Sequence, residues 1–91
     1  MANPLRNPRV IENLADDELF LYDDTGQELN VLNKTALLIW SLCDGNHSEM
    51  KIVCLMGEIY PDAGEEEIAS DVAATLSEFR DKGLTHTEEE S

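Results

Sequence analysis

The chain has 91 residues, with 20 acidic and 6 basic side chains and a formal net charge of −14. Such a charge repels phosphate backbones and anionic lipid surfaces, so it argues against nucleic-acid or membrane partners and favours a basic one. The length suits one domain, and no segment reaches the roughly 18 consecutive apolar residues of a membrane span. Because residues 1–6 lack the apolar stretch of a signal peptide, a cytoplasmic protein is expected.

The N-terminal third predicts short strands. Residues 1–9 carry two prolines and are expected to form an irregular arm. Strands are expected at residues 10–14 and 19–23, the second being rich in aromatic and aliphatic side chains. A hairpin loop is expected at residues 23–26, where glycine can adopt the positive φ that returns the chain.

The third expected strand covers residues 27–32 and alternates polar and apolar side chains. On this alternation Leu29 and Val31 should face the core, whereas Glu28 and Asn30 should face solvent. A three-stranded sheet leaves an exposed edge strand, which a protein must either blunt or use.

The stretch from Leu32 to Gly45 predicts a complete helix. Asn33 is suited to the N-cap, and Gly45 can supply the left-handed residue that ends the helix. Its apolar stripe consists of Ala36, Ile39, Trp40 and Cys43. This helix is therefore expected to pack between the strands before it and the helices after it.

Two further helices follow. The first should begin after Ser48 as N-cap and stop at Pro61, with an apolar stripe of Ile52, Leu55, Met56, Ile59 and Tyr60. The second should cover residues 65–82 and end in a Schellman motif at Gly83. Its apolar positions are Ile68, Val72, Leu76 and Phe79.

These elements predict an α+β, winged-helix-like fold, in which a three-stranded antiparallel sheet is followed by three helices. The domain should span residues 10–85, and residues 86–91 should form a disordered acidic tail. The exposed strand edge also permits an edge-paired or strand-exchanged dimer.

The sequence offers little for catalysis. His47 and His86 lie in an expected turn and tail without a nearby nucleophile, and solvated surface roles are expected for both. Cys43 and Cys54 lack the spacing of a zinc site and are expected to be reduced, half-buried thiols. No catalytic residue, cofactor or metal site is therefore expected.

A helix pair of this kind also raises the possibility of DNA binding. The helix expected at residues 65–82 would have to enter the major groove, yet its N-terminal end is its most acidic part. Three classes of function stay open at this point. They are a peptide-binding module, a transcription-associated winged helix or acidic DNA mimic, and a structural subunit of an enzyme complex without a peptide groove.

A strand edge can recruit an extended peptide as an added strand, and residues 27–32 with the helix at 65–82 are the best candidates for the walls of such a groove. Plain core positions are the alternative for Val31, Val72, Leu76 and Phe79. Asp71, Thr75 and Glu78 lie near the polar border of the helix, where they could contact a peptide or water.

The chain resembles PqqD-like proteins in an ordered set of motifs. These are Leu32-Asn33-Lys34-Thr35-Ala36, Ile39-Trp40-Ser41-Leu42-Cys43-Asp44-Gly45, Ser48, Tyr60-Pro61, Asp71-Val72 and Lys82-Gly83-Leu84. The resemblance covers roughly residues 10–85. In the expected hairpin loop, Asp23-Asp24-Thr25-Gly26 departs from the Pro-Glu-Gly-like turn common in that family.

The resemblance implies a RiPP recognition element, a domain that captures the leader of a ribosomally made precursor peptide. The leader would add as a strand beside the third strand and be delivered to a modifying enzyme such as a radical SAM protein, protease or cyclase. Carried onto this chain, the docking edge would comprise Glu28, Leu29, Asn30, Val31 and Leu32. The helical wall would comprise Ile68, Asp71, Val72, Thr75, Leu76 and Phe79.

Overall fold

The structure is a computed structural model of the chain, and it describes residues 3–22 and 29–87. The elements in chain order are β1 (Pro4–Arg6), β2 (Ile11–Ala15), β3 (Glu18–Tyr22), β4 (Leu29–Leu32), α1 (Lys34–Ser41), α2 (Glu49–Ile59), α3 (Glu65–Asp81) and β5 (Thr85–Thr87). Strands β2, β3 and β4 form an antiparallel sheet, and β1 pairs with β5. The expected α+β fold, with a three-stranded sheet followed by three helices, is confirmed.

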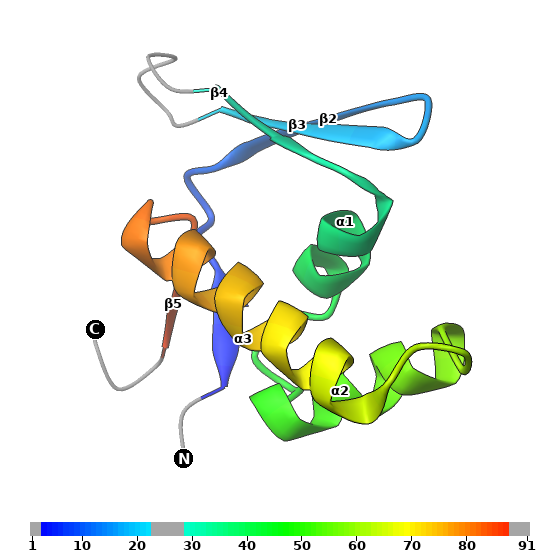
Figure 1. Cartoon of the computed structure of the whole chain (residues 1–91). Coiled ribbons are helices and arrows are strands. Elements are labelled where there is room, and N and C mark those ends of the chain that lie inside the picture. Colours follow the sequence, from blue (N-terminus) through cyan, green and yellow to red (C-terminus); the bar gives the residue numbers. More distant parts are fainter. Residues whose placement is uncertain (1–2, 23–28, 88–91) are drawn as a thin grey trace.

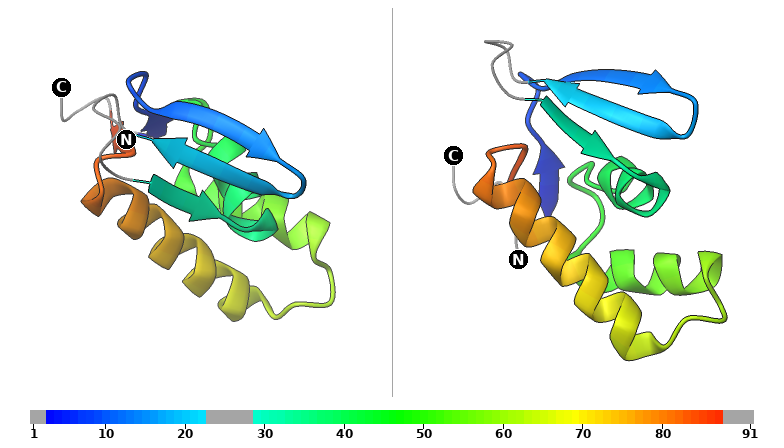
Figure 2. Two further views of the ribbon diagram at one scale, coloured as in Figure 1. Left: turned by 90° about the horizontal axis from the view of Figure 1, so that it is seen from above. Right: turned by 45° about the horizontal axis from the view of Figure 1, so that its top comes forward.

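The sheet forms one layer and the helices form the other (Figure 1). Helix α1 lies closest to the sheet and contacts β3 and β4, whereas α2 lies farthest from it and packs against α3 (Figure 2). The long helix α3 runs beneath the edge of the sheet that β4 forms. This arrangement leaves a strand edge and a helix side by side.

The strand register decides which face of the sheet is buried. Leu32 lies opposite Leu19, and Asn30 lies opposite Leu21. Because residues directly opposite share a face, Leu32 and Asn30 point toward the helices with the buried Leu19 and Leu21.

The expectation that Leu29 and Val31 face the core is therefore wrong. Their side chains are 54% and 47% exposed on the outer face, opposite Tyr22 and Phe20. The same alternation places Asn30 on the inner face, where its side chain is half-buried. The side chains of the strand alternate between the two faces as predicted, but the residues predicted to face inward face outward and the reverse.

The core lies between the sheet and the helices and continues among the three helices. Trp40 and Phe79 are its aromatic centre, with an edge-to-face contact at 5.4 Å and an interplanar angle of 84°. The other buried apolar side chains are Leu19, Leu21, Leu32, Ile39, Cys43, Ile52, Met56, Ile68, Val72, Leu76 and Leu84. Burial of one large side chain of this kind contributes about 1.5–3 kcal/mol, so α3 is held mainly by its apolar stripe.

Helix α1 ends at Ser41, so the expectation that Gly45 ends this helix is wrong; Gly45 has a φ of +82° but lies in the loop that follows. The other helix ends follow the sequence signals. The Asn33 side chain accepts a hydrogen bond from the backbone N–H of Ala36 at 2.9 Å, and Ser48 caps α2 in the same way through the N–H of Lys51. At the end of α3, Gly83 has a φ of +72° and the N–H of Leu84 donates to the Phe79 carbonyl at 2.8 Å. This is the predicted Schellman ending, and it fixes where α3 stops.

Two segments differ from the expectation. The arm predicted as irregular contains β1, and the start of the predicted tail belongs to β5, since Leu5 lies opposite His86. Their pairing brings residues 4–6 beside residues 85–87, and two segments of three residues are too short to carry a local pattern that predicts it. The hairpin loop at residues 23–26 and the tail at residues 88–91 lie outside the described residues.

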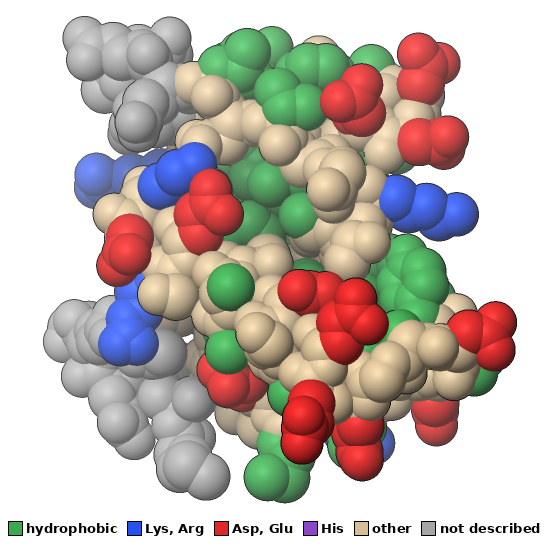
Figure 3. Space-filling view, viewed as in Figure 1, with side chains coloured by type: hydrophobic (Ala, Val, Ile, Leu, Met, Phe, Trp, Pro, Cys, Tyr) green, Lys and Arg blue, Asp and Glu red, His purple; other side chains and the backbone are tan. Residues whose placement is uncertain are grey.

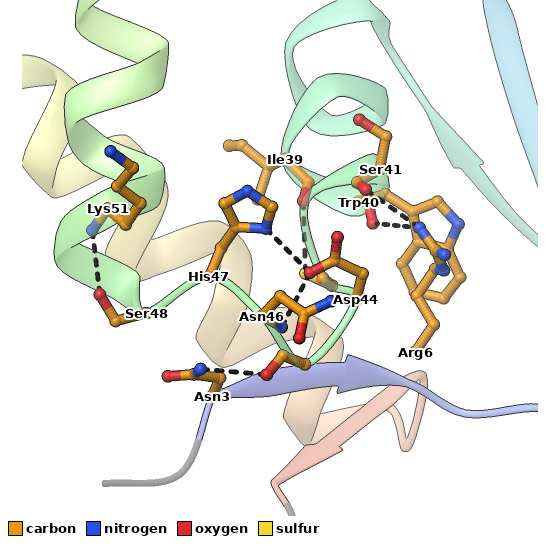
Figure 4. A network of polar contacts seen from close by, with 12 residues as sticks. Asn3, Arg6, Ile39, Trp40, Ser41, Asp44, Asn46, His47, Ser48 and Lys51 are labelled. Carbon is orange, nitrogen blue, oxygen red and sulfur yellow. Dashed lines mark hydrogen bonds and ion pairs between the residues drawn. The ribbon is translucent and has the colours of Figure 1, made fainter.

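Strand β1 also holds the loop between α1 and α2 (Figure 4). The backbone N–H of Arg6 donates to the Cys43 carbonyl at 2.8 Å, and its guanidinium donates to the carbonyls of Trp40 and Ser41 at the end of α1. Asn3 donates to the Gly45 carbonyl at 3.0 Å. The guanidinium therefore satisfies the Ser41 carbonyl at the helix end and adds a second hydrogen bond to the Trp40 carbonyl, which also accepts from the N–H of Cys43.

Within this loop, the carboxylate of Asp44 accepts a hydrogen bond from the backbone N–H of Asn46 at 2.9 Å and contacts Nδ1 of His47 at 2.8 Å. These contacts hold the pKa of Asp44 below its usual range, the Asn46 bond contributing most.

Neighbouring Cys43 is fully buried, and burial raises the pKa of its thiol to about 12. Cys54 is exposed, so neither thiol is half-buried as expected, and both are free.

Candidate functional site

A groove of about 590 Å³ separates β4 from α3. In the space-filling view, hydrophobic side chains are visible inside the hollow between the sheet and α3 (Figure 3). The lining residues are Leu29, Asn30, Val31, Leu32, Asn33, Thr35, Ala36, Asp71, Ala74, Thr75, Glu78, Phe79, Lys82 and Leu84. One wall is thus a strand edge and the other is one side of a helix.

The hydrogen-bonding direction of each strand residue follows from the first hairpin. Its two-residue loop closes on Ala15 and Glu18, which must be a hydrogen-bonded pair, because the two loop residues are adjacent in the chain and cannot form the next pair. Bonding along the central strand alternates from side to side. Glu18, Phe20 and Tyr22 therefore bond toward β2, and Leu19 and Leu21 bond toward β4.

The same alternation determines toward which side each residue of β4 directs its backbone N–H and C=O groups. Leu32 and Asn30, which lie opposite Leu19 and Leu21, direct their backbone groups toward β3. The backbone N–H and C=O groups of Leu29 and Val31 then point to the open edge, where no other strand of the described residues pairs. Each is a strong donor or acceptor, and the edge offers them to an additional strand.

The helical wall comes from the stripe next to the buried one on α3. The residues Asp71, Thr75, Glu78 and Lys82 recur at intervals of three and four, so they lie on one side of the helix. The buried stripe packs α3 against α1, where Phe79 contacts Trp40, and α1 in turn contacts β4. Ala74 keeps the wall low, since its side chain is a single methyl group.

At one end of the groove, a side chain crosses from the helix to the strand. Nζ of Lys82 donates to Oδ1 of Asn30 at 2.9 Å and to Oε1 of Glu78 at 2.9 Å. Both contacts are exposed, so they contribute little to stability.

The groove contains some of the residues suggested by the sequence and omits others. Leu29, Asn30, Val31, Leu32, Asp71, Thr75 and Phe79 line it. Ile68 and Val72 instead line a smaller cavity of about 170 Å³ between the helices, and Leu76 faces a separate depression beside β5. Glu28 lies outside the described residues.

The sequence expectation did not assign several lining residues to the groove. Asn33, Thr35, Ala36, Ala74, Lys82 and Leu84 belong to this set, and Glu78 was placed only near the border. The spacing of Asp71, Thr75, Glu78 and Lys82 could have indicated the helical members. Asn33, Thr35 and Ala36 line the groove only because α1 begins directly after β4, and their sequence pattern does not indicate this position.

The chemistry available in the groove is hydrogen bonding and apolar contact along an extended chain. Residues 3–22 and 29–87 contain no group of three or more His, Cys, Asp or Glu side chains that could hold a metal ion. The helices within those residues are also too short or too polar to cross a membrane.

Residues 18–84 match the family described as "Coenzyme PQQ synthesis protein D (PqqD)", from the start of β3 to the end of the Schellman motif. No curated protein sequence matches the chain significantly.

Two solved structures share the fold. One is TbiB1 in complex with the TbiA(beta) leader peptide, with a TM-score of 0.78 and 23% identity over 90% of this chain and 94% of that chain. The other is the heterocyclase TruD, with a TM-score of 0.63 and 17% identity. There the match covers 96% of this chain but 12% of the heterocyclase chain. On the extent of the family match, the chain belongs to the PqqD family.

Proposed function

We propose that this protein is a non-catalytic chaperone that captures the leader of a ribosomally synthesised precursor peptide by strand addition. The observation that carries the proposal is the open edge of β4, whose unpaired backbone groups at Leu29 and Val31 lie beside the wall of α3. In strand addition, backbone hydrogen bonds supply affinity and the neighbouring side chains select the sequence.

The comparisons support this proposal. TbiB1, which shares the fold over nearly its whole length, was solved with a leader peptide. Membership of the PqqD family agrees with a role in the maturation of a peptide.

The captured peptide is then presented to a modifying enzyme, in our proposal a radical SAM protein, a protease or a cyclase. The same fold occupies about 12% of the chain of TruD, whose name describes it as a heterocyclase, and a link between this fold and such an enzyme supports the proposal. Because the precursor comes from the ribosome, capture takes place in the cytoplasm.

The test begins with a search for short open reading frames beside the gene of this protein, and each encoded candidate peptide is then titrated calorimetrically. The N-terminal half of that peptide is expected to bind, and the C-terminal half serves as the control. An extended segment ordered on binding should show a negative heat-capacity change, because apolar surface is buried. No binding of either half, or equal binding of both, would contradict leader capture.

A further inference from the structure

The groove carries an uneven distribution of charge. Among its described lining residues, Asp71 and Glu78 are acidic and Lys82 is the only basic one. Lys82 lies at the end of the groove where β4 begins, since it contacts Asn30. The chain has a net charge of −14, so a positively charged side chain in the groove is unusual, and a bound peptide would contact it directly.

Lys82 retains hydrogen-bonding capacity. An ammonium group has three N–H donors, and the contacts to Asn30 and Glu78 use two of them. Because an ammonium cannot accept a hydrogen bond, the Asn30 atom facing Lys82 must be its oxygen. The Nδ2 amide of Asn30, with two donors, then has no described partner. Two donor groups from opposite walls are therefore available at the same point.

A strand added to β4 would place one side chain at this point. The peptide residue opposite Asn30 shares its inner face. Since the backbone of Asn30 bonds toward β3, this position is a non-hydrogen-bonded pair, with Cα atoms only about 4.5 Å apart. A carboxylate there could accept from Nζ of Lys82 and Nδ2 of Asn30 without breaking either present contact of Lys82.

The neighbouring peptide positions face different surroundings. The residues opposite Leu29 and Val31 would point to the outer face, beside side chains that are 54% and 47% exposed. Apolar residues at those two positions would remove this apolar surface from water. The outer face thus favours apolar residues on both sides of the inward-pointing one.

We propose that Lys82 and Asn30 together bind the carboxylate of an Asp or Glu residue that the peptide carries between two apolar residues. This inference rests on the proposed function and names the class of segment that the groove selects. Specificity then comes from a charge-assisted pair, in a site where other charged lining residues repel acids.

The test selects binders from a displayed library of randomised short peptides, using the wild-type protein and the variant Lys82→Met. The wild type should enrich sequences with an acid flanked by apolar residues. Selected peptides should lose roughly three- to tenfold in affinity for Lys82→Met, and they should lose a similar factor when the acid becomes its amide. In the variant, the second change should have little further effect, because the two groups act as a pair.

Two further variants separate charge from structure. Lys51→Met removes the same charge from α2, away from the groove, and should leave the selected motif unchanged. Lys82→Arg should retain the acidic preference. Enrichment of peptides without an acidic position would overturn this inference while leaving peptide binding intact. Failure to enrich any peptide would contradict the proposed function itself, and the inference with it.

Discussion

The sheet has two open edges, and only one of them is a candidate site. Strand β2 is exposed along its whole length and pairs with β3 alone among the described strands. Strand β4 is equally unpaired at its outer edge, but α3 lies beside it and creates the groove. An open edge supplies hydrogen bonds to any chain, whereas a wall next to it supplies area and selectivity.

The β2 edge also carries features that discourage pairing. The backbone groups of Glu12 and Leu14 point outward by the same alternation that directs Leu29 and Val31. Glu12 places a charge on that edge, and Asp16 turns the strand end with a φ of +57°. Charged side chains on short edge strands are a common protection against unwanted pairing.

The largest expected effect comes from removing one outward N–H on each edge. Val31→Pro deletes a donor on β4 that the added strand would use, so peptide affinity should fall by roughly tenfold to a hundredfold. Leu14→Pro deletes the equivalent donor on β2 and should leave affinity within about threefold. Fluorescence anisotropy with a labelled leader measures both. Equal losses in the two variants would remove the distinction between the edges.

A third proline variant checks the assigned directions. Asn30→Pro removes an N–H that bonds to β3, so it should lower the stability of the folded state itself. If Asn30→Pro folded normally while Val31→Pro unfolded, the alternation derived from the first hairpin would be wrong.

The second effect comes from obstructing the groove. Ala74→Phe places a ring in the groove and should weaken peptide binding by roughly three- to tenfold, through lost contact area. Ala73→Phe is the matched control, since Ala73 is also exposed on α3 but lies on the side away from β4. Calorimetric titration of both variants gives the comparison. Weaker binding by Ala73→Phe alone would locate the site on the opposite side of α3.

A smaller effect is the pH dependence of the free energy of unfolding that Asp44 causes, and it should not involve either strand edge. Because the folded pKa of Asp44 is below the ordinary value of 3.8, its stabilising contribution is fully present above that value and is lost as pH falls through the folded pKa. Asp44→Asn lacks this dependence. The difference in free energy of unfolding between wild type and Asp44→Asn should therefore shrink in strong acid, as measured by urea unfolding. A difference independent of pH would contradict the assigned role.

The two thiols provide a check on the core in every edge variant. Exposed Cys54 should react rapidly with a thiol reagent, whereas Cys43 is buried and its raised pKa leaves almost no thiolate. One thiol should react in the native state and two after unfolding. Rapid reaction of two thiols in Val31→Pro would mean that its binding loss reflects a damaged core.

The sequence predicted the helices better than the strands for a physical reason. Helix ends depend on local residues, and Asn33, Ser48 and Gly83 each act within one turn. Which side chains of β4 are buried depends on its pairing with β3. Because Leu32 lies opposite the buried Leu19, Leu29 and Val31 must point to the outer face although they are apolar. The β1–β5 pairing depends on contacts between the two ends of the chain.

For the site, the sequence indicated the two walls but not their composition. The strand segment was assigned from its alternation and position, and Asp71, Thr75 and Phe79 line the groove as suggested. The buried stripe of α3 was assigned to the wall, although Ile68, Val72 and Leu76 point elsewhere. Only the angle at which α3 meets β4 decides which stripe borders the groove.

The most direct test of the central claim is amide hydrogen exchange, followed residue by residue by NMR with and without the leader peptide. In the free protein, the amides of Asn30 and Leu32 should be protected by β3, and those of Leu29 and Val31 should exchange rapidly. Added leader should protect Leu29 and Val31 while Leu14 on β2 stays unprotected. Protection that appears on β2, or leader binding that leaves Leu29 and Val31 unprotected, would contradict strand addition at β4.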